Sequence, residues 1–194
     1  LPFAIIITIL FSLFIDRYIF RFYRIKKSPP VTLAMVSIGV MFITNAIVRI
    51  IIGPKDRRFF DGEKFIVKVK EFKNLTGLNE GLAIKSTQVI TVFITLLLVA
   101  ILFWFLQRTR TGKSMRAFSD NEDLALLSGI NPDRVVLFTW LIVAALATTA
   151  GVLYGLDKSF KPFTYFSILL PIFAAAIVGG IGSPVGAVVG GYVI

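Results

Sequence analysis

The sequence of 194 residues contains no cysteine and no histidine. A disulfide scaffold and a thiol nucleophile both need cysteine, and His-ligated metal sites and histidine acid/base catalysis need histidine. Charged residues are also scarce at 16%, whereas 56% of the residues are hydrophobic. One soluble core cannot bury so much apolar surface. The composition therefore predicts a membrane protein and excludes many classes of enzyme.

Basic residues outnumber acidic residues, 21 to 11. Nucleic-acid-binding proteins share such an excess, but here the Lys and Arg residues lie in loops between long apolar runs. Polytopic membrane proteins carry their basic residues in such loops. We therefore expect contact with membrane lipid and no binding of nucleic acid.

Four stretches are long and apolar enough, or nearly so, to cross the hydrocarbon core as helices, which takes about 20 residues. They are residues 1–15, 31–52, 83–106 and 135–156. A bilayer permits a helix bundle because every backbone polar group is satisfied within it. The fold expected is an all-α polytopic membrane protein, a transmembrane helix bundle.

Residues 164–194 form a fifth apolar stretch that residues unfavourable to helices interrupt. The interrupting residues are Gly179, Gly180, Gly182, Ser183, Pro184 and Gly186. We expect a helix, a glycine-rich break and a second helix. In one interpretation, the spacing of Gly182, Gly186 and Gly190 lets a neighbouring backbone pack closely. In the other, Ser183 caps a half-helix whose amides face a translocation path and favour a substrate carboxylate.

Both ends of the chain, Leu1 and Ile194, lie within apolar runs, which predicts a polypeptide truncated on both sides. Alternating spans place residues 16–28 and 107–134 on one face and residues 53–82 and 157–163 on the other. Lys and Arg are balanced between the faces, so the positive-inside rule does not orient the chain. Alternating apolar and Lys residues within 55–82 predict a strand or short hairpin outside the bilayer.

The loop 107–134 contains signals of a short helix. Ser119 followed three residues later by Glu122 matches a capping box, which predicts a helix from Asp120. Asp120, Glu122 and Asp123 then fall in its first turn, where the helix dipole favours negative charge. Gly129 suits the position after the last turn. We expect about two to three turns, joined to the spans by basic linkers and shaped either to dock a partner or only to connect.

These motifs resemble those of LivH-type permeases from branched-chain amino acid ABC importers. The similarity covers most of the chain except the loop 55–82. It runs through residues 30–53, 111–117, 126–131, 134–135, 150–153, 178–184 and 186–187.

The resemblance implies a role for the loop 107–134, because in such importers this loop carries a Glu-Ala-Ala-x-x-x-Gly motif that docks into the ATPase. The matching positions here are Asp123, Leu124, Ala125 and Gly129, so the first position departs conservatively and the second does not. The loop is then cytoplasmic. The coupling residues expected are Ser119, Asp120, Glu122, Asp123, Ala125 and Gly129.

The chain has no phosphate loop of its own, since Thr111-Gly112-Lys113-Ser114 follows Gln107 where that motif needs glycine. Acids or metal ligands at membrane depth are also missing, because Asp16 and Arg17 lie at the predicted end of a span. We therefore expect no enzyme activity, metal or bound cofactor, with ATP used by a partner subunit. A self-contained secondary transporter or channel stays open as the alternative function.

For the whole protein, the resemblance implies a permease subunit that moves branched-chain amino acids into the cytoplasm. Its expected partners are ABC ATPase subunits, a second permease subunit in a heterodimer, and a periplasmic or extracellular amino-acid-binding protein. The expected location is the bacterial plasma (inner) membrane, with residues 16–28 and 107–134 on the cytoplasmic side.

Overall fold

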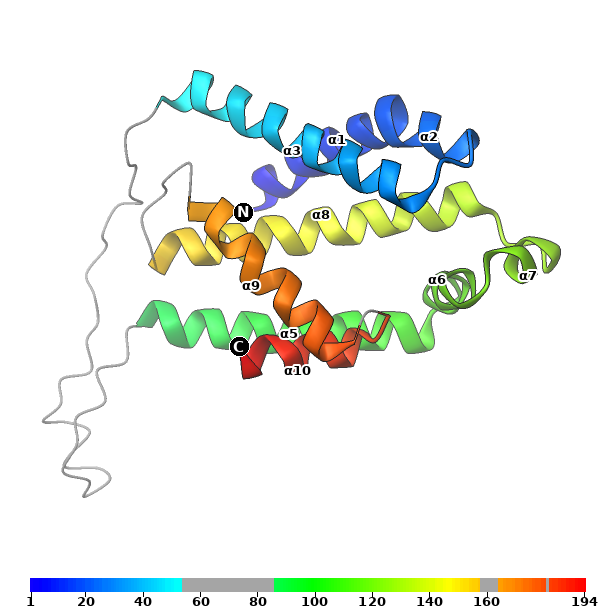
Figure 1. Ribbon diagram of the computed structural model, residues 1–194. Coiled ribbons are helices and arrows are strands. Elements are labelled where there is room, and N and C mark those ends of the chain that lie inside the picture. Colours follow the sequence, from blue (N-terminus) through cyan, green and yellow to red (C-terminus); the bar gives the residue numbers. More distant parts are fainter. Residues whose placement is uncertain (54–85, 158–163, 181) are drawn as a thin grey trace, which may run out of the picture. The chain divides into compact units, whose positions relative to one another are not determined.

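The computed structural model describes residues 1–53, 86–157, 164–180 and 182–194. Every regular element in these ranges is a helix (Figure 1). Four of the helices in these ranges are long and apolar enough to cross a membrane. The prediction of an all-α polytopic membrane protein is confirmed, whereas the predicted hairpin within 55–82 lies outside the described residues.

Three of the predicted spans match single helices closely. They are α3 (Pro30–Ile52), α5 (Ser86–Arg108) and α8 (Pro132–Asp157). Proline begins α3 and α8, where its missing N–H costs no helical hydrogen bond. Asn131 starts α8, because its side-chain oxygen accepts hydrogen bonds from the amides that follow.

The first predicted span is longer than expected. The helix α1 (Pro2–Ile15) continues through a π-helical turn, η1 (Asp16–Phe20), into α2 (Arg21–Ile25). The predicted loop 16–28 is therefore wrong over most of its length, and Asp16 lies inside a continuous helix. The helix ends only at Ile25, before Lys27, which has a positive φ of 49°, and before Pro29, which cannot continue a helix.

The chain divides into two compact units. The first unit contains α1, η1, α5 and α8, together with α6 (Arg110–Asp120) and α7 (Glu122–Leu127). In this unit α8 packs against α1 and against α5. Small or β-branched residues such as Ala144 and Thr149 are buried along α8. Contact is therefore close where small side chains permit it, while most apolar side chains face outward, as lipid requires.

The second unit contains α3, α9 (Thr164–Gly179) and α10 (Pro184–Val193). The ring of Phe42 on α3 contacts the ring of Phe166 on α9, with 6.2 Å between their centroids. The helices α9 and α10 pack against each other across the break. The expected pattern of helix, break and helix is thus confirmed.

Candidate functional site

The segment between α5 and α8 begins with a helix that the sequence analysis missed. Its first cap is Thr109, whose hydroxyl accepts a hydrogen bond of 3.0 Å from the amide of Gly112. The basic linker expected before residue 119 is therefore wrong, because these residues form α6. A β-carbon at Gly112 would collide with the carbonyl oxygen of Phe105 and lie 2.6 Å from the Cα of Leu106. Glycine at position 112 thus lets α6 fold tightly against the end of α5.

The beginning of α7 also differs from the prediction. Ser119 and Asp120 are the last two residues of α6, so Ser119 caps no helix and Asp120 lies at a helix C-terminus. The cap is Asn121, in extended conformation at φ −157°, whose Oδ1 accepts a 3.0 Å hydrogen bond from the amide of Leu124. Asparagine caps helices as well as serine does, and here it also forms the corner between the helices. Glu122 and Asp123 do fall in the first turn, as predicted.

The end of α7 agrees with the prediction. Gly129 has a φ of +80°, and its amide donates to the carbonyl of Leu126 at 3.0 Å. The amide of Ile130 donates to the carbonyl of Ala125, also at 3.0 Å. This pair of bonds is a Schellman motif, which satisfies the last carbonyls of a helix and favours glycine at the left-handed position. Gly129 therefore shapes the corner between α7 and α8.

The helix α7 contains six residues, fewer than the two to three turns expected. Ala125 is 3% exposed, whereas Leu127 is 85% exposed and Leu124 is also exposed. Glu122 and Asp123 add two exposed acidic side chains at its start. Exposed leucines outside the bundle are typical of a surface that meets another protein. In the motif positions, Ala125 therefore faces inward and Leu124 faces outward.

In the second unit, the break between α9 and α10 is a tight turn. Gly180 and Gly182 have φ values of +91° and +109°, which suit glycine far better than other residues. The hydroxyl oxygen of Ser183 accepts a 3.1 Å hydrogen bond from the amide of Gly186, and Pro184 opens α10. The predicted cap at Ser183 is confirmed, but no observation tests a role in translocation.

Glycines hold the two helices of the break close together. A β-carbon at Gly186 would collide with the backbone of Gly179, and one at Gly190 with the carbonyl of Ala175. The predicted close packing is confirmed for these two glycines. It is wrong for Gly182, which lies in the turn, because Ser183 and Pro184 start the helix after it.

A polar contact joins two spans, and the sequence analysis did not predict it. The indole N–H of Trp140 on α8 donates a 2.8 Å hydrogen bond to the carboxylate of Asp16. The ring of Phe20 contacts that of Trp140, with 5.5 Å between centroids. Asp16 lies about 14 Å before the end of its helix at Ile25. The sequence signal that could have revealed this contact is a single acidic residue beside an apolar run, because a charged residue within a span normally has a polar partner.

Residues 1–194 match the family described as "Branched-chain amino acid transport system / permease component". The chain belongs to this family. The match extends through both units, so both lie within this type of permease. No solved structure matches the chain.

Three relatives of this chain are described as permeases of branched-chain amino acid transport. The high-affinity branched-chain amino acid transport system permease protein LivH of Salmonella typhimurium is 31% identical over 98% of this chain and 60% of the relative. The probable LivH permease of Methanocaldococcus jannaschii is 37% identical over 57% of this chain and 35% of the relative. The permease protein BraD of Pseudomonas aeruginosa is 35% identical over 59% and 38%, respectively. The chain thus spans about 60% of the length of the first of these relatives.

Proposed function

We propose that this chain is part of a permease subunit of an ABC importer that moves branched-chain amino acids into the cytoplasm. The observation that carries the proposal is the match of residues 1–194 to the permease family. The spans would provide the path, and a separate ATPase would supply the energy. This division of labour accords with a sequence that has no phosphate loop.

Residues 119–130 are the proposed contact with the ATPase. The short helix α7 exposes Leu124 and Leu127 and begins with the carboxylates of Glu122 and Asp123. A cap at Asn121 and the left-handed Gly129 fix both of its ends. A force on α7 would therefore pass directly into α8, which follows after a short turn.

The test is co-purification of the full-length protein with candidate ATPase subunits from its own genome. Asp123→Lys should abolish capture, because it reverses an exposed charge on α7. Asp133→Lys is the matched control, since it makes the same change in the first turn of α8. Gly129→Trp should also abolish capture by forcing a side chain into the left-handed position.

Three results together would support α7 as the coupling element. Asp123→Lys and Gly129→Trp should lose capture, Asp133→Lys should keep it, and the amount of protein in the membrane should be unchanged in all three. Capture of no ATPase by the wild-type protein would reject the importer mechanism. Transport by the purified protein alone would then favour a self-contained transporter or channel.

We also propose that the break between α9 and α10 lies along the translocation path. Ser183 and the first amides of α10 would favour the carboxylate of an amino acid, because the N-terminus of a helix attracts negative charge. Gly179, Gly180 and Gly182 would keep the backbone free of side chains around that point. The support is the geometry of Ser183, which is exposed and caps α10.

Ser183→Val tests this role, with Ser37→Val on α3 as the matched control. Ser37 is also exposed, and its hydroxyl donates to the carbonyl of Leu33 on its own helix. Ser183→Val should lower uptake at least tenfold while leaving assembly intact, and Ser37→Val should leave both unchanged. Equal loss of uptake and assembly in Ser183→Val would refute a role in the path.

The proposed setting is the bacterial inner membrane, with α6 and α7 on the cytoplasmic side. The segment that joins α2 to α3 would lie on the same side. A second permease subunit would complete the path as a heterodimer. A periplasmic or extracellular binding protein would deliver the amino acid, so that selection is shared with that protein.

A further inference from the structure

We propose that α6 binds anionic phospholipid headgroups through one basic face, which consists of Arg110, Lys113 and Arg116. The inference concerns a surface separate from the exposed leucines of α7. It requires only that α5 crosses a membrane, and it is independent of the substrate and of the ATPase.

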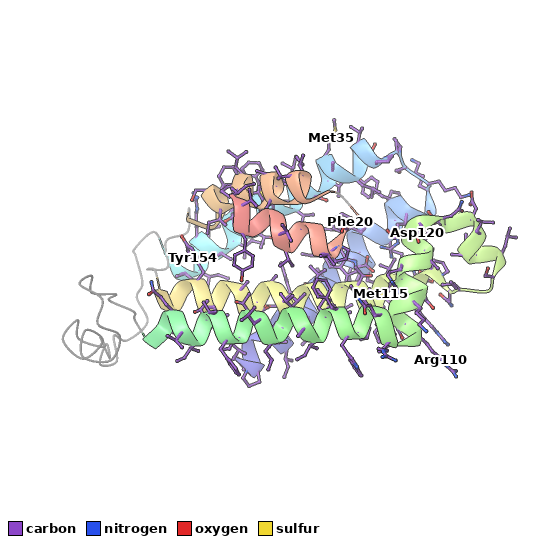
Figure 2. The ribbon with its side chains drawn as sticks, turned by 90° about the horizontal axis from the view of Figure 1, so that it is seen from below. Phe20, Met35, Arg110, Met115, Asp120 and Tyr154 are labelled. Carbon is purple, nitrogen blue, oxygen red and sulfur yellow. The ribbon has the colours of Figure 1, made fainter. Side chains whose placement is uncertain are left out.

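The three basic residues lie on one side of the helix. Positions separated by three residues are neighbours on a helical surface, so Arg110, Lys113 and Arg116 form a row. All three are exposed, whereas Met115 and Phe118 on the opposite side are partly buried. Figure 2 shows Arg110 directed away from the bundle at one end of α6 and Asp120 at the other end. The basic face therefore covers the first two turns, and the carboxylate of Asp120 limits it.

The position of α6 places this face at the level of the headgroups. The apolar part of α5, Gln88–Arg108, contains 21 residues, which is about 32 Å of helix. The hydrocarbon core is about 30 Å thick, so Arg108 lies at its boundary. Only Thr109 separates α5 from α6. The basic face thus starts within one turn of the point where the span leaves the hydrocarbon.

The helix α6 stays at this level because it runs across the end of α5 and does not extend it. Figures 1 and 2 show the two axes crossing. The crossing depends on Gly112, because a β-carbon at this position would collide with the backbone of Phe105 and Leu106. A helix that lies in the interface with basic residues on one side is suited to an anionic membrane surface.

The charges on this face have no partner within the described part of the chain. Within the described residues, the side chains of Arg110, Lys113 and Arg116 form no ion pair or hydrogen bond; the hydroxyl of Ser114 donates to the backbone carbonyl of Arg110 and leaves its guanidinium free. Each basic residue near an anionic leaflet typically strengthens attachment about fivefold. Phosphate headgroups are the complementary charge at this depth, so they are the occupant that the geometry favours.

The experiment measures lipid retained by the full-length protein. Wild-type protein is placed in nanodiscs that contain phosphatidylglycerol and phosphatidylethanolamine, and the bound lipids are counted by native mass spectrometry. The test variant combines Arg110→Gln, Lys113→Gln and Arg116→Gln. One control, Arg110→Lys with Arg116→Lys, keeps the charge. A second control combines Arg21→Gln, Lys26→Gln and Lys27→Gln, which removes three exposed charges from the segment before α3.

In the test variant, the ratio of bound phosphatidylglycerol to bound phosphatidylethanolamine should fall at least fivefold. Each lost basic residue is expected to weaken the attachment of anionic lipid about fivefold. Both controls should stay within twofold of the wild type. An unchanged ratio in the test variant would overturn the proposal. Equal loss in the second control would also overturn it, because the effect would then be general. Loss of ATPase capture without any change in lipid would assign the face to a protein partner instead.

Discussion

At the scale of single residues, the contact between Asp16 and Trp140 is the feature that the sequence did not predict. A carboxylate within a span is costly to bury, and a hydrogen bond from an indole N–H reduces that cost. The bond joins η1, which directly continues α1, to α8 at 2.8 Å. Asp16 can therefore lie inside a continuous helix, where charge counting alone predicts the end of one.

Trp140→Phe should destabilise the protein by about 1 to 2 kcal/mol, because the ring is kept while the donor to a charged acceptor is lost. Unfolding by a denaturant in detergent micelles measures this difference. Trp104→Phe is the matched control, since Trp104 is 64% exposed. An equal effect of the two substitutions would contradict a stabilising role for the Asp16 bond.

At the scale of elements, long apolar runs made the spans predictable, because their burial in lipid depends on composition more than on detail. The break after α9 was predictable for the same reason, since Gly180 and Pro184 oppose helix formation. The helix α6 was not predictable in this way. Its stability depends on Thr109 as a cap and on the contact of Gly112 with α5, which is visible only in three dimensions.

The start of α7 shows a second limit of sequence reasoning. Ser119 and Asn121 are both good caps, and the capping-box pattern favoured the wrong one. The extended backbone at Asn121 decides between them, and it exists because α6 continues to Asp120. The residues proposed for coupling are therefore divided between two helices, because Ser119 and Asp120 belong to α6, and Glu122, Asp123 and Ala125 belong to α7.

Asn121→Ala should weaken α7 by about 1 kcal/mol, because the amide of Leu124 loses its acceptor. Hydrogen exchange at the first amides of α7 should then accelerate about fivefold, as 1 kcal/mol implies. Ser119→Ala is the control and should leave these rates unchanged. If Ser119→Ala accelerated exchange and Asn121→Ala did not, the assignment of the cap would be wrong.

The pairing of α9 with α10 gives another prediction at this scale. Gly186→Ala should cost about 1 to 3 kcal/mol, because its new methyl group meets the backbone of Gly179. Gly191→Ala is the matched control on the same helix, since a β-carbon there meets nothing within 4 Å. Thermal unfolding in detergent compares the two variants. Similar melting temperatures would show that the two helices are not held by this contact.

At the scale of the whole molecule, the alternation of spans predicts the side on which each loop lies. The helices of the first unit are consistent with this alternation, because the Asp16–Trp140 contact joins the second half of the helix Pro2–Ile25 to the first half of α8. Which face is cytoplasmic depends on the proposed coupling, since Lys and Arg are balanced between the faces. Chemical labelling can decide this independently.

The chain has no cysteine, so a single introduced thiol can be labelled without interference if the rest of the full-length protein lacks cysteine or is made to lack it. Ser119→Cys should react with a membrane-impermeant maleimide only after the cells are permeabilised. Asn74→Cys, in the loop predicted on the other face, should react in intact cells. The reverse pattern would place α6 and α7 outside and would exclude contact with a cytoplasmic ATPase.

The hydrogen bond between Trp140 and Asp16 also offers an optical signal. The chain contains two tryptophans, so within this chain Trp104→Phe leaves Trp140 as the single indole fluorophore. Its emission depends on the carboxylate beside it, and it therefore reports on the separation of α1 from α8. If these helices part during a transport cycle, the emission should change in step with it; if they move as one body, the emission should stay constant.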